Sequence, residues 1–159
     1  MNRKILAGAL CLALVGSTSS VWAVTCPSGS SPSKLKGTFA QLLTGFVGNP
    51  PQPTGNTAPE ASTGTITADG NGGFTGNLTF NAGGTVCSGT VTGTFCANDD
   101  GSGRGTATGQ FTGTSGTCPS GGSQSESFTI VGPNRIDFIS TDSESVLSGS
   151  AIRQNQGKD

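Results

Sequence analysis

The strongest constraint on the fold is a pattern that repeats along most of the chain: short stretches of alternating residues, each followed by a cluster of Gly, Asn and Asp. Alternation with a period of two is typical of a β-strand that buries one face. The cluster 69–73, with the sequence Asp-Gly-Asn-Gly-Gly, favours a tight hairpin turn because Gly and Asn tolerate positive φ. The segment 74–81 follows it, and its apolar and small residues share one face: Phe74, Gly76, Leu78 and Phe80. The chain is therefore predicted to be all-β.

Eight strands with short connections are expected, and no segment has a helical pattern. The segment 48–59 contains four prolines and is predicted to be a loop. Eight consecutive antiparallel strands close an up-and-down barrel, and Gly at alternate positions suits its curvature. An eight-stranded antiparallel up-and-down barrel is therefore the predicted fold, with a β-sandwich as the alternative. The predicted strands are 38–47, 61–68, 74–81, 85–96, 104–114, 126–131, 135–141 and 145–153.

The first residues predict export. Arg3 and Lys4 precede a short apolar run over 5–15, and Val21-Trp22-Ala23 fits a signal-peptidase site, so cleavage is expected after Ala23. The apolar run is shorter than the roughly 20 residues that span a bilayer. The protein is therefore expected in the periplasm or secreted, in a bacterial type of export. The predicted organisation is a signal peptide at 1–23, an irregular lead-in at 24–36, the barrel domain at 37–154 and a disordered tail at 155–159.

The mature chain keeps four cysteines, an even number that indicates two disulfides in an exported protein. Cys87 and Cys96 lie at opposite ends of one predicted strand, roughly 30 Å apart and too far to pair. If the next hairpin turns at Asp100, Cys87 lies opposite Thr114 and near Cys118. The geometry therefore predicts the bridges Cys87–Cys118 and Cys26–Cys96. Metal ligation is the weaker interpretation, because the chain has no His and no closely spaced cysteine pair.

The charge of the mature chain limits its partners. Without Arg3 and Lys4, six of the eight basic residues remain against nine acidic ones, so the formal net charge is −3. A mildly acidic chain without a basic stripe argues against nucleic acid and anionic membrane surfaces as partners. The mature chain is also poor in large apolar residues, so we expect the disulfides to offset a small core.

Several segments together resemble a known group of proteins. They are the blocks 64–76, 92–95, 100–108, 128–131, 136–142 and 148–154. Their order and spacing are similar to those of an uncharacterised family of small exported bacterial β-barrel proteins, whose fold is similar to lipocalin-like and allene-oxide-cyclase-like barrels. The resemblance covers most of 37–154. It implies a barrel with an apolar interior, and it carries over no catalytic residue.

Candidate catalytic groups are few. The absence of His excludes the usual Ser-His-Asp and Cys-His sets. Most acidic residues fall in predicted turns, and Asp137 is the exception. If Ile136 and Phe138 face inward, Asp137 faces solvent; if Ile139 does, Asp137 is buried and is a site candidate. The carboxylates weighed as a catalytic pair are Glu60, Asp69, Asp99, Asp100, Glu126, Asp137, Asp142 and Glu144.

Two further possibilities are weaker. The Asp-rich turns at 69–73 and 98–103 loosely resemble calcium loops but lack the full ligand spacing, so plain turns are the simpler interpretation. The Thr-x-Thr pairs suggest an ice-binding array, but they occur with no fixed period.

The leading hypothesis is a non-enzymatic exported barrel, either a small-molecule-binding protein or a structural component of the envelope. No cofactor or metal is expected, the partner is a small apolar ligand, and the mature chain is not expected to insert into a membrane. The alternatives are an isomerase-like or cyclase-like enzyme for an apolar substrate, and a surface interaction module. The interior forms either a filled core or a small cavity. Its expected residues are Phe74, Leu78, Phe80, Val91, Phe95, Phe111, Phe128, Ile130 and Phe138, with Asp137 as a further site candidate.

Overall fold

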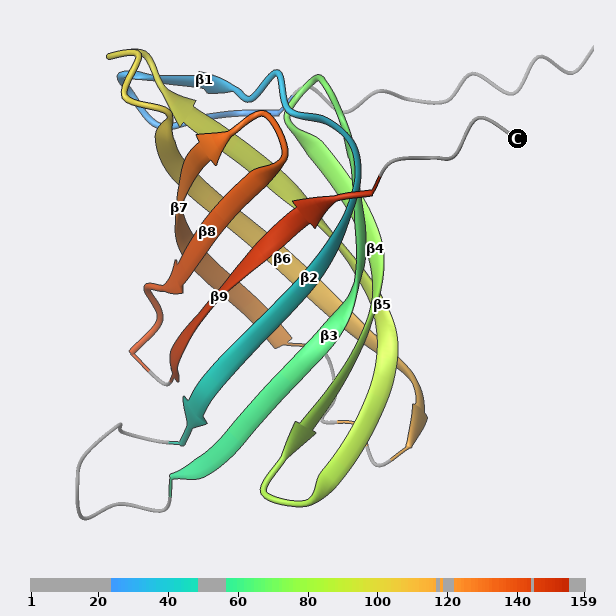
Figure 1. The fold of residues 1–159 in the computed structure, drawn as a ribbon. Helices are drawn as coiled ribbons and strands as arrows, with labels where there is room; N and C mark the ends of the chain where they lie inside the picture. The colour runs from blue at the N-terminus through green and yellow to red at the C-terminus, as the bar shows by residue number, and fades with distance from the viewer. Residues whose placement is uncertain (1–23, 49–56, 117, 119–121, 144, 155–159) are drawn as a thin grey trace, which may run out of the picture.

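A computed structural model describes residues 24–48, 57–116, 118, 122–143 and 145–154 (Figure 1). The predicted signal peptide and C-terminal tail lie outside these residues. Within them the protein consists of β-strands and turns, and no helix is long and apolar enough to cross a membrane. The strands are β1 (Ser30–Pro32), β2 (Lys36–Val47), β3 (Ala58–Asp69), β4 (Gly73–Ala82), β5 (Thr85–Asn98), β6 (Arg104–Gly116), β7 (Gly122–Gly132), β8 (Arg135–Ser140) and β9 (Ser145–Arg153).

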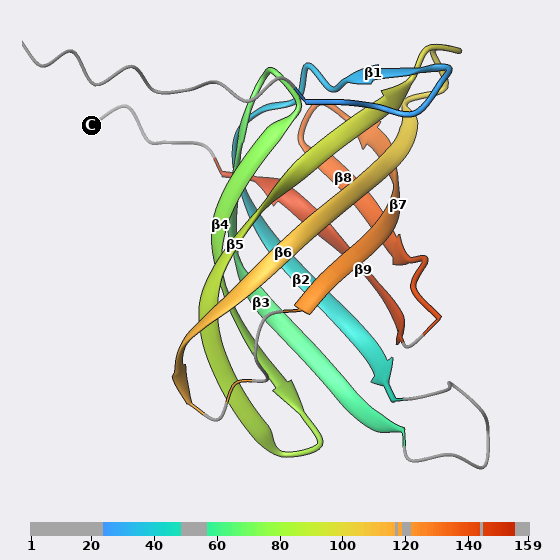
Figure 2. The same ribbon diagram turned by 180° about the vertical axis from the view of Figure 1, so that it is seen from behind.

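Strands β2 to β9 form a closed barrel (Figures 1 and 2). Each pairs antiparallel with the next along the chain, and β9 pairs with β2 to complete the ring. The predicted eight-stranded up-and-down barrel is confirmed, and the sandwich alternative is wrong. Closure leaves each of these strands hydrogen-bonded on both sides, so no long sheet edge remains exposed.

The predicted loop at 48–59 extends too far along the chain, because β3 already begins at Ala58. Pro59 lacks an N–H, yet it lies opposite Phe46 of β2, and its carbonyl accepts a hydrogen bond from Gly83 N at 2.9 Å. Proline is tolerated there because the ladder between β3 and β4 begins only at the next residue, Glu60. Strand β7 likewise begins at Gly122 rather than at residue 126, within a stretch rich in Gly and Ser.

The lead-in 24–36 is not wholly irregular, since it contains β1. Thr94 is the last residue of β5 that pairs with β4. Strand β5 continues beyond it, and this extension pairs with β1. Hydrogen bonds from Ser33 N to Phe95 O (2.9 Å) and from Asp99 N to Gly29 O (3.0 Å) continue the attachment on both sides of β1. The lead-in therefore lies along one end of the barrel, as Figures 1 and 2 show from opposite sides.

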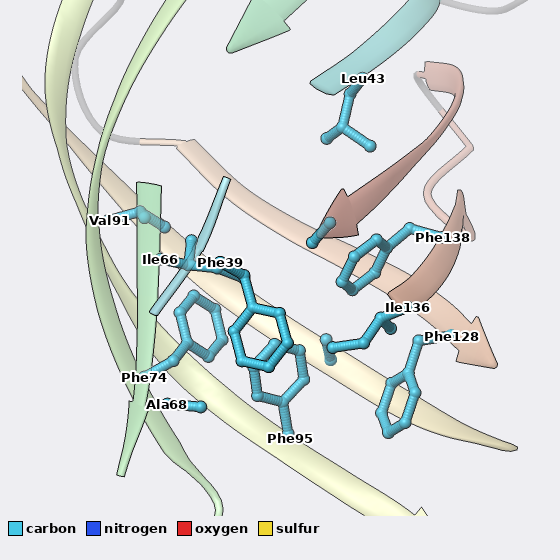
Figure 3. Close-up of a cluster of buried hydrophobic side chains, with 12 residues drawn as sticks. Phe39, Leu43, Ile66, Ala68, Phe74, Val91, Phe95, Phe128, Ile136 and Phe138 are labelled. Carbon is cyan, nitrogen blue, oxygen red and sulfur yellow. The ribbon is translucent and has the colours of Figure 1, made fainter. Parts of the chain in front are cut away.

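We call this the core end of the barrel, because the buried apolar side chains concentrate there (Figure 3). Phe95 lies near the middle of the cluster, with its ring centroid 4.6 Å from that of Phe74 and 5.5 Å from that of Phe128. Leu35 of the lead-in packs against the cluster. The buried cluster is Phe39, Leu43, Ile66, Ala68, Phe74, Val91, Phe95, Ala107, Phe128, Ile136, Phe138 and Ala151.

Inward glycines make room for these rings. Gly93 lies opposite Phe74, and a Cβ at Gly93 would come within 2.5 Å of the Phe74 ring. Gly105 lies opposite Phe128, and a Cβ at Gly105 would likewise come within 2.5 Å of the Phe128 ring. The alternating glycines therefore let large rings lie across a neighbouring strand, a pairing that fills a core with few large residues.

The outer face carries mostly Thr, Ser and Asn. Its exposed large apolar side chains gather mainly on β2 and β9, where Phe46 and Val146 are cross-strand partners. Leu42 on β2 and Ile152 on β9 belong to the same outer surface, and Ile139 on β8 lies beside it.

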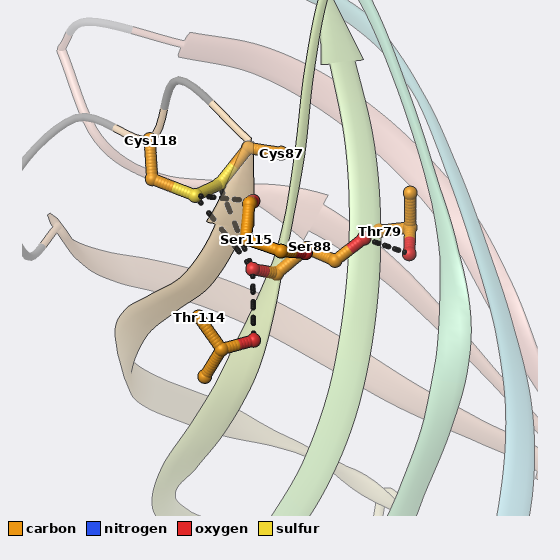
Figure 4. Close-up of a disulfide and its surroundings, with 6 residues drawn as sticks. All are labelled: Thr79, Cys87, Ser88, Thr114, Ser115 and Cys118. Carbon is orange, nitrogen blue, oxygen red and sulfur yellow. Dashed lines mark hydrogen bonds between the residues drawn. A yellow bond between two sulfur atoms is a disulfide. The ribbon is translucent and has the colours of Figure 1, made fainter.

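Both predicted disulfides are confirmed: Cys26–Cys96 at the core end, with Cα atoms 5.6 Å apart, and Cys87–Cys118 at the opposite end, with Cα atoms 5.1 Å apart (Figure 4). A shift in register after Ser88 places Cys87 opposite Gly116 rather than opposite Thr114 as predicted. Ser88 O accepts a hydrogen bond from the Thr114 hydroxyl at 3.2 Å. Two disulfides in one small domain indicate an oxidising environment.

Candidate functional site

The half of the barrel away from the core end encloses a cavity of about 650 Å³. We call this half the mouth end, because the lining reaches the strand ends at Val47, Ala82 and Gly122. The large apolar side chains of the lining are Leu43, Val47, Ile66, Phe74, Leu78, Phe80, Val91, Phe95, Phe111, Phe138 and Leu147. Several of these residues also belong to the buried cluster, so the core forms the floor of the cavity.

The lining becomes polar toward the mouth because the inward face of two strands changes character along its length. On β3 the inward positions pass from buried Ile66 to Ser62 and then Glu60. On β7 they pass from buried Phe128 to Glu126 and then Gln124. A period of two fixes each of these polar side chains on the same face as the core residue next to it. The polar part of the lining also includes Gln41, Ser123, Asp142, Ser143 and Ser145.

Glu126 is the most perturbed acid in the cavity. Burial raises the pKa of the Glu126 carboxyl to about 7, and the nearby negative charge of Asp142 acts in the same direction. Burial also raises the pKa of the Glu60 carboxyl. Removing a carboxylate from water disfavours its ionised form unless a positive charge or hydrogen-bond donors replace the lost water. The mouth therefore holds carboxylates whose ionised forms gain from a donor or a cation.

The turn between β8 and β9 is held against β7, which brings Asp142 close to Glu126. Asp142 Oδ2 accepts a hydrogen bond from Ser125 N at 2.9 Å. Thr141 N donates to Ser125 O, also at 2.9 Å. Because Ser125 immediately precedes Glu126, these bonds fix the two carboxylates on adjoining segments.

Two further polar atoms of the lining have no hydrogen-bond partner within the described ranges: Gln124 Nε2 and Ser145 Oγ. Both atoms are buried. A buried polar atom without a partner is costly and is uncommon in folded proteins. Their position in the lining indicates that the mouth is suited to receive a polar group.

Seven of the residues predicted to face the interior line the cavity: Phe74, Leu78, Phe80, Val91, Phe95, Phe111 and Phe138. Phe128 is also interior, but it lies in the buried cluster rather than in the cavity wall. The structure therefore combines the two alternatives for the interior, with a filled core at one end and a hollow at the other.

Asp137 is not an interior residue. Ile136 and Phe138 face inward, so the alternation of β8 directs Asp137 outward. Its carboxylate accepts a hydrogen bond from Arg135 Nε at 2.8 Å on the exposed surface. The hypothesis that Asp137 is a buried site residue is therefore wrong.

Glu60, Gln124 and Glu126 were not singled out by the sequence analysis as cavity residues. The signal that finds them is the same alternation that located the core: two and four residues before Phe128 are Glu126 and Gln124. The predicted strand 126–131 includes Glu126 but begins too late to include Gln124. Glu60 was assigned to no strand for the same reason.

The Asp69 turn has a structural role. Asp69 Oδ1 accepts hydrogen bonds from Asn71 N at 2.6 Å and from Gly73 N at 3.0 Å. Gly70 and Gly72 adopt φ of 84° and 88°, which other residues rarely do. In the described part of the chain, no group of three or more His, Cys, Asp or Glu is arranged to hold a metal ion.

The chain matches no protein-family model, no curated protein and no solved structure. Function is therefore inferred from the geometry and chemistry of the cavity. An apolar pocket with a few convergent polar groups is the usual form of a small-molecule site.

Proposed function

We propose that the protein is an exported, non-enzymatic barrel that binds a small apolar molecule in the cavity at its mouth end. The observation that carries the proposal is a hollow of about 650 Å³, lined largely by aliphatic and aromatic side chains. Pockets for small ligands fall between about 300 and 1,000 Å³. A purely structural barrel has no need to leave half of its interior unfilled, since empty apolar volume costs stability.

The apolar lining provides the driving force for binding. Each methylene group that a ligand buries contributes roughly 0.8 kcal/mol, so a chain of about ten carbons contributes on the order of 8 kcal/mol before the cost of association is subtracted. The resemblance to lipocalin-like barrels supports the same function. The apparent signal peptide and the disulfides support export to the periplasm or the medium, where such a protein would carry a poorly soluble compound.

A neutral apolar fluorophore, N-phenylnaphthylamine, tests the proposal directly. We expect its fluorescence to rise on binding to the mature, oxidised protein, with saturation at one site. Leu78 lines the cavity, whereas its neighbour Asn77 points outward. Leu78→Trp should fill part of the hollow and weaken binding by about tenfold or more, since overfilling an occupied site costs 1–3 kcal/mol.

Asn77→Trp is the matched control, because it adds the same side chain to the same strand on the outer face. It should bind the fluorophore like the unmodified protein. Equal weakening by the two variants, or no saturable binding by the unmodified protein, would overturn the proposal.

A second candidate function is favoured by one observation, the Glu126 carboxyl with its pKa raised to about 7. A carboxyl that titrates near neutral pH inside a cavity suits general acid–base catalysis, and an isomerase of an apolar substrate needs little else. Ligands extracted from unmodified protein and from Glu126→Gln, both purified from the native host, distinguish the two functions. A carrier yields one compound from both proteins, whereas an isomerase yields chromatographically distinct isomers.

A further inference from the structure

We propose that the ligand of this cavity is an apolar amine whose cationic nitrogen binds at the mouth, beside Glu126 and Asp142. The inference rests on the proposed binding function and specifies the chemical class of its ligand. Many apolar molecules would fit the hydrophobic floor. The polar groups at the mouth select among them by charge.

The charged residues that line the cavity are all acidic, and each comes from a different segment. Glu60 lies on β3, Glu126 on β7 and Asp142 in the turn between β8 and β9. An anionic head group beside Glu126 and Asp142 would find no positive charge in the lining to offset its desolvation. An ammonium group would meet acceptors instead, and hydrogen bonds between charged partners are about twice as strong as neutral ones.

Within the part of the chain that the structure describes, positive charge lies at the other end of the barrel. Each basic residue in the described ranges lies at or near a strand end of the core end: Lys34, Lys36, Arg104, Arg135 and Arg153. The sequence segments that join strands at the mouth, 48–57, 83–84, 117–121 and 141–144, contain no Lys or Arg. A carboxylate or phosphate group at the mouth would therefore find no basic side chain among the described residues of this half of the barrel.

The unpartnered atoms provide independent support for a polar head group. Gln124 Nε2 and Ser145 Oγ are buried in the lining without a partner in the described residues. The hydroxyl of Ser145 can accept a hydrogen bond from an ammonium group, and an oxygen next to the amine would give the amide of Gln124 an acceptor. A wholly apolar ligand would leave both atoms unsatisfied.

Binding of an amine also resolves the unfavourable environment of Glu126. Burial and the charge of Asp142 both disfavour its ionised form. A cation placed next to the carboxylate favours that form again. An alkylamine remains protonated well above neutral pH, as a lysine does with its pKa of about 10.4. Above pH 7, ammonium and carboxylate would therefore face each other as an ion pair.

The test compares three ligands with the same alkyl chain: decylamine, decanol and decanoate. Each displaces N-phenylnaphthylamine from the oxidised protein near pH 8, below its micellar concentration. We expect decylamine to bind about tenfold more tightly than decanol, and decanoate more weakly than both, because a charge-assisted hydrogen bond contributes 1.5–3 kcal/mol.

The pH dependence identifies the group responsible. As the pH falls through 7, Glu126 becomes protonated and its attraction for the ammonium group is lost, so decylamine should bind more weakly. Decanol should show no such change. In Glu126→Gln, the advantage of decylamine over decanol should shrink severalfold and no longer vary near pH 7.

Asp137→Asn is the matched control, since it removes a carboxylate from the outer face. It should leave the order and the pH dependence of the three ligands unchanged. If decanol binds but decanoate binds as tightly as decylamine, the amine inference is overturned while the binding function stands. If neither the fluorophore nor decanol binds, the proposed function itself has failed.

Discussion

Glu126 lies two residues before the buried Phe128 on the inward face of β7, and this position sets its chemistry. Burial separates its carboxyl from water and raises its pKa from 4.5 to about 7. In the unfolded chain the same group would titrate near its ordinary value. The folded state therefore holds the proton of Glu126 more tightly than the unfolded state does.

Replacing Glu126 by Gln should consequently change how stability depends on pH. Because the folded-state pKa is the higher one, stability falls as the pH rises from about 4.5 to about 7, and the loss is complete above pH 7. Glu126→Gln removes the ionised form, so it should raise the free energy of unfolding near pH 8 by up to about 3 kcal/mol. Near pH 4 the two proteins should be about equally stable.

Urea unfolding of both oxidised proteins, followed by circular dichroism across this pH range, measures the effect. Asp137→Asn provides the baseline for loss of a surface carboxylate. Parallel stability curves for Glu126→Gln and the unmodified protein would show that Glu126 is not buried as described.

Single residues also show why the cavity was harder to predict than the core. Phe74 was placed inside because it shares one face of an alternating segment with Leu78 and Phe80. Glu126 follows the same alternation, but acidic residues are almost never fully buried, so its own chemistry argued against the interior. Asp137 attracted attention for lying within an apolar run, and only the barrel settled which of its neighbours faces inward.

Among the strands, β1 depends most on its attachment to the rest of the barrel. It has three residues and pairs with β5 alone. Its segment is tied to the barrel by the Cys26–Cys96 bridge and by the hydrogen bond from Ser33 N to Phe95 O. Ser33 is buried, whereas Lys34 next to it is exposed. The lead-in is therefore held on the barrel by these contacts, and its detachment would expose the peptide bond after Lys34 to a protease.

The rate of cleavage by trypsin should measure how readily the lead-in detaches. In Cys26→Ala/Cys96→Ala, cleavage after Lys34 should accelerate by about tenfold or more, as expected for a loss of roughly 1.4 kcal/mol of local stability. The rate is read by mass spectrometry of the reduced digest, and slow cleavage at Arg104 in β6 confirms that the barrel stays folded.

The control is Cys87→Ala/Cys118→Ala, which removes the bridge at the mouth end. It should leave cleavage after Lys34 at the rate of the unmodified protein. Equal acceleration in both variants would show that the bridges act through global stability, and that the lead-in does not open as a separate element.

The sequence predicted elements well where alternation and turn chemistry agreed. The turn at 69–73 and the alternation in 74–81 located β4 within one residue at each end. Both bridges followed from the length of one strand, the hairpin at Asp100 and the up-and-down order of the strands. The strand starts at Ala58 and Gly122 were missed because Pro, Gly and Ser have low strand propensity. Ring closure supplies partners on both sides of these segments, and that tertiary effect outweighs local preference.

The whole molecule is polarised along the barrel. The buried apolar cluster, β1 and the described basic residues occupy the core end, whereas the cavity and its three carboxylates occupy the mouth end. Asp69, Asp99 and Asp100 lie at the core end beside the basic residues, so among the described residues only the mouth end carries charge of a single sign. A solute approaching the mouth experiences a field set by the acidic residues, because charges beyond about 10 Å are screened at moderate salt.

This polarity predicts how ionic strength affects association. Acidic groups that line a concave, poorly solvated site raise the local concentration of cations and so speed their binding. Raising the salt from about 10 mM to about 150 mM shortens the screening length from about 30 Å to about 8 Å. The association rate of decylamine, measured by stopped-flow displacement of the fluorophore, should therefore fall severalfold, while that of decanol stays constant. The affinity of decylamine should fall with its association rate, since its dissociation depends mainly on contacts inside the cavity, where salt screens little. If salt slowed decanol equally, the effect would come from the apolar chain, and the separation of charge along the barrel would have no part in ligand capture.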